Sequence, residues 1–364
     1  MAKEFSKLDS EKAQEKQNDA DVVSPMKSRK KTFVLMGFLV FVTLFGGLVL
    51  ASYNFMKYRY VRSGPLEAET VFQVPSGAGL SSIAAQLEKD GFIDSAVMLK
   101  LNAKLTGIGS ALKTGEYPIE AGASMHDIIT TLESGKTVLY PVTLPEGLTS
   151  AQMMRLIAKA ETLTGELPPT PPEGSLLPET YMHPRGMSRA ALVDKMKSAQ
   201  NELLDELWET RQEGLPINSK KEALILASVV EKETGIGAER DKVAGVFTNR
   251  LRLGMRLQSD PTIIYGVSKG EILRGRDGKQ RGLRRSEIDR KTDWNTYQID
   301  GLPKTPICNP GAEAIAAVLN PGETDALFFV ADGSGGHVFS KTNAEHNKNV
   351  AKWRKIERKM RSGN

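Results

Sequence analysis

The chain has 364 residues, of which 40% are hydrophobic, so it is long enough for one large or two medium domains with their own cores. It carries 49 lysines and arginines against 44 aspartates and glutamates, and a net charge of +5 is too small to indicate a nucleic-acid partner. Cys308 is the only cysteine, which excludes an internal disulfide, and the four histidines lack zinc-site spacing, so we expect no metal and no cofactor.

The N-terminal part predicts a membrane anchor. Residues 1–32 are polar and lack apolar periodicity, which is typical of a disordered tail. Residues 33–53 contain no charge and have the length needed to span a bilayer, so we expect a transmembrane helix, followed by a linker over residues 54–68. A cleaved signal peptide is the alternative, because Val49–Ala51 resembles a cleavage site, but both the leader and the apolar run are long for one.

Residues 69–135 predict a small α+β module. A strand, TVFQV, is followed by a Pro-Ser-Gly turn and a helix whose apolar stripe contains Ile83 and Leu87, with Gly91 as its C-cap. A LKTGEYPI segment and a helix around Met125–Leu132 come next. This order of elements resembles a LysM domain, which is a peptidoglycan-binding βααβ fold. The alternative is a module that only packs, because glycine turns before helices occur in many folds.

Residues 136–364 predict a larger α+β domain. A strand-like segment, VLYPVTLPEG, opens it, and a hairpin with a turn at residues 332–336 lies near its end. Apolar periodicity between them predicts three helices, over Arg189–Glu213, Glu222–Thr234 and Ala238–Leu253. Gly235 and Gly254 are positioned to end the second and third helices.

Two glutamates at the end of the second helix are candidates for acid–base chemistry. Glu231 and Glu233 lie about 200° apart around the helix axis, so both cannot serve one site, and periodicity does not separate them. Apolar neighbours and the negative end of the helix dipole disfavour an ionised carboxylate, so either pKa is expected to be raised. Such an acid can protonate a glycosidic oxygen, whereas the alternative is an ordinary structural ion pair.

Polar and aromatic residues further along the chain suit a sugar-binding groove. Rings pack on sugar faces and amides bind hydroxyl groups, while the alternatives are a core position for the rings and a turn cap for the aspartate. The candidates are Gln258, Asp260, Tyr265, Asn295 and Tyr297.

Long sequence blocks resemble one known family. Residues 226–235, 239–266, 295–311 and 328–348 closely resemble the endolytic murein transglycosylase (MltG, or YceG-like) family, and the resemblance covers nearly everything after the apolar run. EGSLLPETY also matches, with Glu179 where the family often has an acidic residue. In that family the second glutamate of the Glu-Lys-Glu-Thr motif is catalytic, which implies Glu233 as the catalytic residue.

The resemblance implies a lyase that cleaves the bond between N-acetylmuramic acid and N-acetylglucosamine in nascent peptidoglycan strands. It leaves 1,6-anhydro ends and acts as a terminase of glycan elongation. It further implies a single-pass inner-membrane protein with a cytoplasmic N-terminus and a periplasmic domain, with peptidoglycan synthases as possible partners. A muramidase-type hydrolase that uses Asp260 and a non-catalytic wall-binding scaffold are the alternatives.

One segment departs from the family pattern. The loop from Lys269 to Lys291 is longer and more basic than the resemblance implies. A solvated loop is the simplest interpretation, and contact with acidic stem peptides is the alternative.

Overall fold

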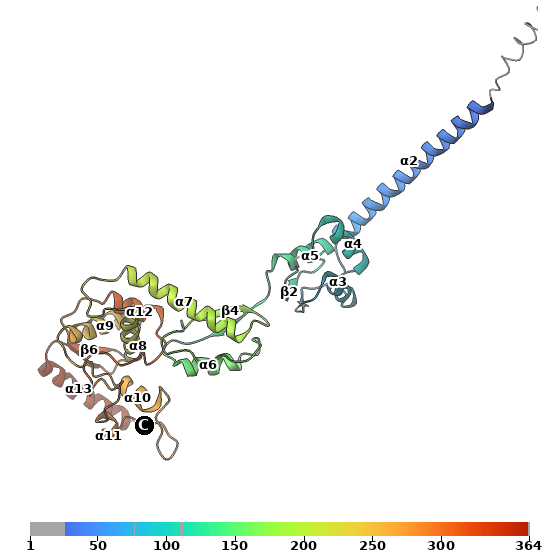
Figure 1. The fold of residues 1–364 in the computed structure, drawn as a ribbon. Helices are drawn as coiled ribbons and strands as arrows, with labels where there is room; N and C mark the ends of the chain where they lie inside the picture. The colour runs from blue at the N-terminus through green and yellow to red at the C-terminus, as the bar shows by residue number, and fades with distance from the viewer. Residues whose placement is uncertain (1–25, 76, 110–111, 363–364) are drawn as a thin grey trace, which may run out of the picture. The chain divides into compact units, whose positions relative to one another are not determined.

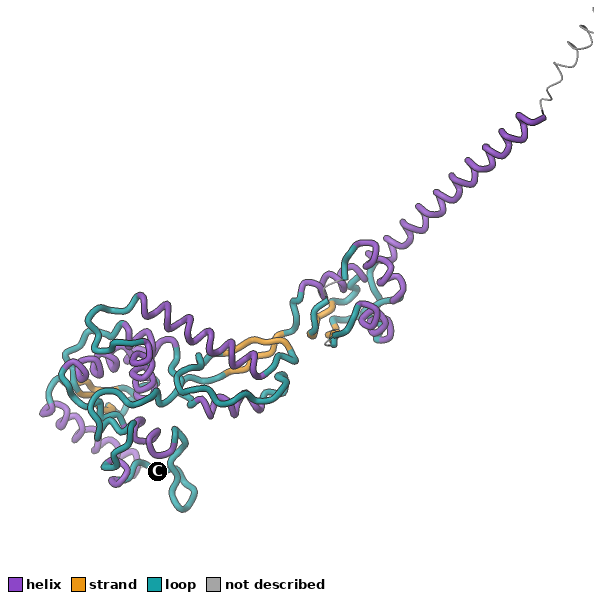
Figure 2. The backbone as a smooth tube through the Cα atoms, viewed as in Figure 1, coloured by secondary structure: helices purple, strands orange, loops and turns teal. Residues whose placement is uncertain are grey.

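The computed structural model describes residues 26–75, 77–109 and 112–362, and the chain divides into two compact units between Lys136 and Thr137 (Figure 1). Helices, loops and three two-stranded sheets alternate along these residues (Figure 2). The predicted mixed α+β class is therefore confirmed. The predicted domain limits are not tested further and stay predictions.

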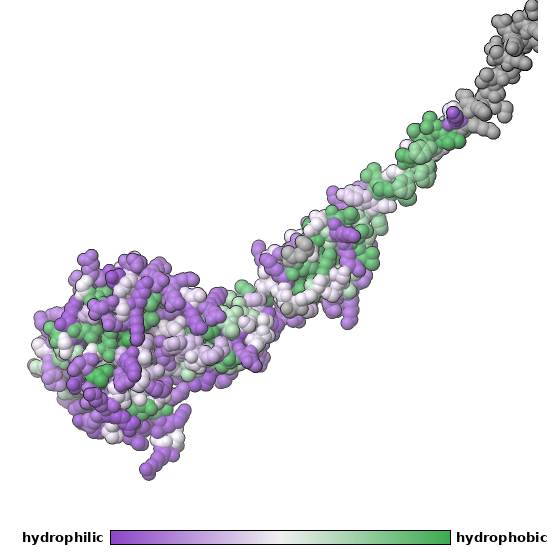
Figure 3. All heavy atoms as spheres, viewed as in Figure 1, coloured by the Kyte–Doolittle hydropathy of each residue, from purple (hydrophilic) through white to green (hydrophobic). Residues whose placement is uncertain are grey.

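Helix α2 (Met26–Val61) is long and apolar. An 18-residue window within its segment Lys31–Val61 has a mean hydropathy of 2.6 and none of that window is buried, so by length and composition the helix can cross a membrane. Figure 3 shows its largely hydrophobic surface. The helix already begins at Met26, within the predicted tail, because extending an existing helix costs far less than starting one. Residues 1–25 of that tail lie outside the described residues.

The remainder of the first unit has the order β-α-α-β-α. Strands β1 and β2 pair in antiparallel register, with Phe72 opposite Tyr117. Both side chains are buried in a core that also holds Leu87 and Leu132. The βααβ part has the predicted order, but the likeness to a LysM domain stays a prediction. The elements are β1 (Thr70–Val74), α3 (Leu80–Lys89), α4 (Ala96–Thr106), β2 (Gly115–Ile119) and α5 (Met125–Ser134).

The second unit begins with an antiparallel ribbon flanked by two helices. Strand β3 pairs with β4, with Val142 opposite Tyr181, and both residues join a core with Met153 and Leu192 from the helices. Thr149 starts the first of these helices with a capping box that satisfies free backbone N–H groups. The elements are β3 (Leu139–Thr143), α6 (Ser150–Lys159), β4 (Thr180–Pro184) and α7 (Arg189–Glu209).

A second core in this unit is built from helices that pack on one another. Ala227 and Val230 of α8 meet Phe247 of α9 and Val318 of α12 in one buried cluster. A hairpin and a last helix complete the unit. The elements are α8 (Lys220–Glu233), α9 (Gly237–Arg252), α10 (Asp260–Ser268), α11 (Arg285–Ile288), α12 (Ala312–Leu319), β5 (Phe328–Ala331), β6 (His337–Ser340) and α13 (Asn343–Ser362).

The predicted helices of this unit exist with small shifts at their ends. Helices α8 and α9 each begin and end within two residues of the prediction. Helix α7 stops at Glu209, four residues before the predicted Glu213, at a stretch with the polar residues Thr210 and Arg211. The predicted hairpin is confirmed as β5 and β6, with Phe329 opposite Phe339.

Candidate active site

A pocket of about 520 Å³ opens in the second unit. It collects segments that are far apart in the sequence: the ends of α8 and α9, the start of α10, a loop after α11, strand β5 and helix α13. Both charged and aromatic side chains line it. The lining residues are Glu233, Arg250, Leu257, Gln258, Asp260, Tyr297, Phe328, Phe329, Val330, Asn343, His346, Asn347 and Val350.

Glu233 is the last residue of α8 and is half-buried. Burial raises the pKa of its carboxyl group to about 7, and the negative charge of Asp260 adds to this increase. The Ser259 hydroxyl group, His337 and the positive charge of Arg250 act in the opposite direction. The carboxyl group is therefore protonated in a large fraction of molecules near neutral pH, as a proton donor requires.

Ser259 is buried beside this acid. Its oxygen has no partner at ordinary hydrogen-bond geometry among the described residues, yet the group faces Glu233 closely enough to lower the pKa of that carboxyl. Its backbone N–H donates to Thr296 Oγ1 at 2.9 Å, which fixes the start of α10.

Glu231 lies away from this pocket. Its carboxylate accepts a hydrogen bond from the backbone N–H of Gly311 at 3.1 Å, in a cluster with Glu146 and Arg240. Burial raises its pKa as well, with Glu146 contributing in the same direction. Two acids that sequence periodicity left equivalent thus have different surroundings, and Glu233 is the one in the pocket.

Asp260 and Tyr297 form a hydrogen-bonded pair in the lining. The tyrosine hydroxyl donates to Asp260 Oδ1 at 2.8 Å, although 37 residues separate the two in sequence. Burial raises the pKa of Tyr297, and the adjacent Asp260 carboxylate raises it further, so the phenol stays protonated. The pair therefore presents one fixed negative charge close to Glu233.

Gln258 also lines the pocket, and its backbone is unusual. Its φ of 52° lies in the left-handed region that residues other than glycine rarely adopt. The backbone N–H donates to the carbonyl of Thr296 at 3.2 Å, which holds this conformation. Such local strain often accompanies a functional side chain that must point in one direction.

Tyr265 does not line this pocket. Its ring is buried, meets the ring of Trp294 edge-on at 5.6 Å between centroids, and lies under the Lys269 ammonium at 5.0 Å. Burial raises the pKa of its hydroxyl group to about 12, and Glu173, which is hydrogen-bonded to it, acts in the same direction. Its predicted role in binding sugars stays a prediction.

Asn295 is likewise outside the lining, but it holds the loop that carries Tyr297. Its Nδ2 donates to the carbonyls of Ile288 at 2.9 Å and Arg290 at 2.7 Å, and its Oδ1 accepts from the Tyr297 backbone N–H at 3.0 Å. The described contacts support the position of Tyr297, while direct sugar binding by Asn295 stays a prediction.

Helix α13 supplies pocket residues that the sequence reasoning missed. Asn343, His346, Asn347 and Val350 follow the i, i+3, i+4, i+7 spacing of one helix face within an otherwise highly charged helix. The His346 ring stacks on Phe328 at 5.2 Å, and burial lowers its pKa. This stripe of amide and imidazole side chains is the sequence signal that could have identified the pocket face of α13.

Arg250 anchors one side of the pocket. Its guanidinium is buried and donates to the carbonyls of Leu327 at 2.6 Å and Leu257 at 2.8 Å. It thereby joins α9 to the strand and to the loop that line the pocket. Its positive charge also lowers the pKa of Glu233.

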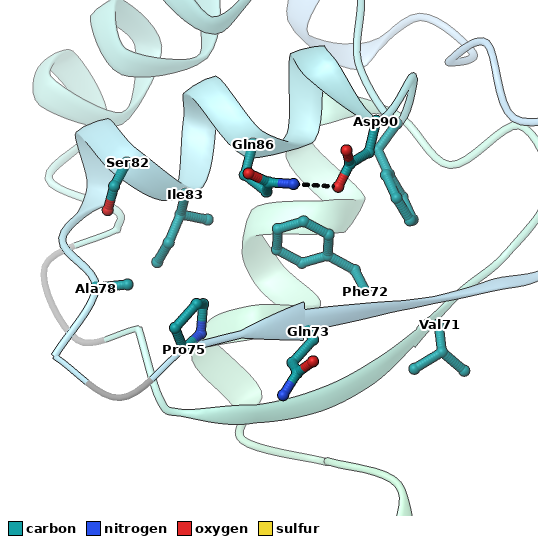
Figure 4. A pocket seen from close by; sticks show the side chains of 10 residues that line it. Val71, Phe72, Gln73, Pro75, Ala78, Ser82, Ile83, Gln86 and Asp90 are labelled. Carbon is teal, nitrogen blue, oxygen red and sulfur yellow. Dashed lines mark hydrogen bonds between the residues drawn. The ribbon is translucent and has the colours of Figure 1, made fainter.

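A second pocket, of about 490 Å³, lies in the first unit between β1 and α3 (Figure 4). Its only carboxylate is Asp90, which accepts a hydrogen bond from Gln86 at 2.6 Å. The sole acid of this pocket is thus already paired, whereas the pocket of the second unit holds a half-buried acid with a raised pKa. Within the described residues no cluster of histidine, cysteine and acidic side chains is arranged to hold a metal ion.

The fold and this pocket define an α+β protein whose pocket holds a half-buried carboxyl group with a raised pKa. The family model of the YceG-like family matches residues 72–352. The chain therefore belongs to the YceG-like family.

Known relatives carry a functional name. An endolytic murein transglycosylase of Bacillus subtilis (strain 168) is 32% identical over 77% of this chain and 83% of its own length. One from Streptococcus pneumoniae (strain D39) is 30% identical over 89% of this chain, which spans only 65% of that relative. A crystal structure of a yceG-like protein from Listeria monocytogenes is 28% identical, covering 78% of this chain and 99% of its own, with a TM-score of 0.46.

Proposed function

We propose that the chain is a membrane-anchored endolytic murein transglycosylase that uses Glu233 as its catalytic acid and base. The observation that carries the proposal is the position of this carboxyl group, half-buried in a pocket and with a pKa raised to about 7. The names of the Bacillus and Streptococcus relatives support peptidoglycan as the substrate.

In the proposed reaction, the neutral carboxyl group of Glu233 donates its proton to the oxygen between N-acetylmuramic acid and N-acetylglucosamine. The bond from C1 of the muramyl sugar to this oxygen breaks, and N-acetylglucosamine leaves with a free hydroxyl group. The muramyl 6-hydroxyl oxygen then bonds to C1, and its proton passes to the Glu233 carboxylate. The glutamate is regenerated, no water is consumed, and the product carries a 1,6-anhydro ring.

The remaining lining residues are proposed to bind and orient the sugars. Gln258 and the amides of Asn343 and Asn347 suit the hydroxyl and acetamido groups of the chain. Tyr297 holds Asp260, whose negative charge near the acid supports positive charge that develops at C1. The apolar helix α2 is proposed to hold the enzyme at the inner membrane with its domains in the periplasm, where it can end nascent strands and work beside synthases.

A hydrolase is the second candidate, because the pocket holds a second carboxylate, Asp260, whose charge acts on Glu233. In a hydrolase this group activates water or attacks C1, and the product is a reducing muramic acid. Mass spectrometry of digested glycan strands distinguishes the two reactions, because their products differ in mass by one water molecule. Reducing ends in place of anhydro ends would exclude the lyase.

The matched pair Glu233→Gln and Glu231→Gln tests the assignment. The first variant should lose cleavage by at least about a hundredfold, as expected for removing a general acid, while the second keeps most of it. Both should bind strands as the parent does in a sedimentation assay with glycan. Loss of turnover in Glu231→Gln alone would contradict the assignment, and no cleavage by the parent chain would favour a non-catalytic scaffold.

A further inference from the structure

A cluster of positive charge lies outside the pocket lining. Residues 269–291, here called the basic hairpin, contain nine lysines and arginines against four aspartates and glutamates. Their excess of positive charge is as large as the net charge of +5 of the whole chain. Figure 1 shows the segment between α10 and α11 projecting from the body of the second unit.

The base of the basic hairpin is built to hold its shape. Arg274 bridges to Gln280, and the Arg281 backbone N–H donates to the carbonyl of Leu273 at 2.9 Å. The Arg281 guanidinium also donates hydrogen bonds of 2.8 and 2.6 Å to the two carboxylate oxygens of Glu287. Glu287 is only 7% exposed, so Arg281 has a structural role and stabilises the base of the hairpin. The hairpin is therefore ordered without a ligand.

Four other cations of the basic hairpin are exposed to solvent. Arg276, Lys279, Arg290 and Lys291 are exposed, and none makes an ion pair with any acidic side chain that the structure describes. An ordered array of unpaired cations attracts anionic groups from its surroundings. Guanidinium groups in particular bind carboxylates through two parallel hydrogen bonds.

The basic hairpin is joined to the pocket at both of its ends. It follows α10, whose first residue, Asp260, lines the pocket. On the other side, Asn295 links the carbonyl of Arg290 to the backbone N–H of Tyr297. The hairpin is therefore connected at both ends to chain segments that bind the sugar under the proposed function.

We propose that the basic hairpin binds the carboxylate-bearing stem peptides of the glycan strand whose backbone occupies the pocket. The inference rests on the proposed function and adds a preference for strands that carry acidic peptides. An anionic lipid surface fits less well, because residues 274–282 contain no apolar side chain and Ile272 is the single exposed large hydrophobic residue of the hairpin. Capture of a peptide beside the pocket would raise the local concentration of the attached strand.

The test compares two variants with equal changes in charge. One replaces Arg276, Lys279, Arg290 and Lys291 by glutamine. The control replaces four lysines outside the predicted LysM-like module that are also exposed and lack an ion pair with a described residue, Lys136, Lys159, Lys195 and Lys221. Cleavage by the full-length proteins in detergent is measured on strands with stem peptides and on the same strands after removal of the peptides.

The hairpin variant should lose about tenfold in kcat/KM on peptide-bearing strands and nothing on bare strands, since each exposed charge contributes only modestly. The control variant should match the parent on both substrates. Equal losses on both substrates, no loss, or an equal loss in the control would overturn the inference. The inference would also be overturned if the hairpin variant lost binding to vesicles with anionic phospholipids but kept the parent's preference for peptide-bearing strands.

A binding assay separates this inference from the proposed reaction. The affinity of the Glu233→Gln variant for a soluble acidic stem peptide, read by fluorescence anisotropy, requires no cleavage. Binding that the four hairpin substitutions weaken about tenfold would support the basic hairpin even if the parent chain cut no glycan. Binding that is absent, or unchanged by the substitutions, would overturn the inference whatever the enzyme does.

Discussion

The hydroxyl group of Tyr297 donates a hydrogen bond to the carboxylate of Asp260, with 2.8 Å between the two oxygens. The carboxylate in turn raises the pKa of Glu233 by its charge. A tyrosine from one loop thus fixes the position of a charge that acts on an acid from a different helix. Three separate segments of the chain are coupled through this one contact.

Removing the tyrosine hydroxyl should therefore weaken catalysis more than folding. For Tyr297→Phe we expect kcat/KM to fall about tenfold and the free energy of unfolding to fall by about 1 kcal/mol, the usual net value of such a hydrogen bond. Tyr117→Phe is the control, because that hydroxyl donates to the Lys113 carbonyl at 2.8 Å in the first unit. The prediction fails if both variants retain the kcat/KM of the parent in urea-free kinetic assays.

The charge of Asp260 should set the upper pH limit of activity. Glu233 acts as a proton donor only while protonated, and the negative charge of Asp260 raises its pKa. For Asp260→Asn the carboxyl group of Glu233 ionises at lower pH, so the alkaline limb of the kcat/KM profile should shift to lower pH. A limb that stays in place or moves upward would show that the two groups are not electrostatically coupled as the structure indicates.

The buried carboxyl group of Glu233 should also lower the free energy of unfolding at neutral and alkaline pH. Its pKa is raised from 4.5 to about 7, so the folded state resists ionisation that the unfolded state allows. The resulting penalty is absent below pH 4.5, grows as pH rises and is complete above pH 7. Glu233→Gln removes it, and we expect the variant to be more stable by about 1–3 kcal/mol at pH 8, the upper value corresponding to the full shift.

Chemical denaturation at two pH values measures this effect. At pH 8 the variant should unfold at a higher urea concentration than the parent, whereas near pH 4 the two midpoints should nearly coincide. Equal midpoints at both pH values would mean that the carboxyl group is well solvated. Such a result would also remove the physical reason for regarding Glu233 as a proton donor at neutral pH.

Much of the fold could be predicted because local signals and final contacts agree. The apolar stripes of α8 and α9 face the common core, and the glycine-rich turn between β5 and β6 closes the predicted hairpin. Gly254, with φ of 66°, lies just after α9, as expected for a helix-ending glycine. The end of α7 could not be placed from the sequence, because polar and charged residues continue a helical pattern from Glu209 to Glu213.

The pocket itself could be predicted only in part. Periodicity could not distinguish Glu231 from Glu233, because their different surroundings come from Gly311 and Arg250, which lie in other elements. The stripe of α13 depends on a tertiary contact with β5, for which the sequence carries no distance information. Tyr265 has the residue type suited to sugar binding, but the fold buries its ring outside the pocket.

Two substitutions of Arg250 separate the effect of its charge on the pKa of Glu233 from the effect of its hydrogen bonds on stability. Arg250→Lys keeps a positive charge near Glu233 but loses the forked contacts to the carbonyls of Leu257 and Leu327. We expect it to lower the free energy of unfolding by about 1–3 kcal/mol, because buried carbonyls lose their donors. The alkaline limb of the kcat/KM profile should stay where it is.

Arg250→Met removes the charge as well as the fork. Since this charge lowers the pKa of Glu233, its loss should move the alkaline limb upward, in the direction opposite to Asp260→Asn. The comparison is made by kcat/KM against pH on the three variants. Shifts of the same sign for Asp260→Asn and Arg250→Met would contradict an electrostatic origin of the raised pKa.

Two glycines of α9 should respond in opposite ways to alanine. A Cβ atom on Gly245 would lie 2.5 Å from the backbone oxygen of Gly322 and 2.8 Å from Thr324 Cγ2, so the helix must move away from the loop. A Cβ atom on Gly237 would meet nothing closer than 3.7 Å. We expect Gly245→Ala to cost about 1–3 kcal/mol, as overpacking does, and Gly237→Ala to be neutral or stabilising by up to about 1 kcal/mol.

The loop that Gly245 touches leads into β5, whose residues Phe328 and Phe329 line the pocket. Asn249 of the same helix donates to the carbonyl of Thr324 at 2.8 Å and ties this loop to α9. Because a shift of the helix must carry through these contacts, kcat/KM should fall in Gly245→Ala and remain at the parent level in Gly237→Ala. Equal stability and equal turnover for the two variants would show that the loop yields freely and that close packing of α9 does not position the pocket wall.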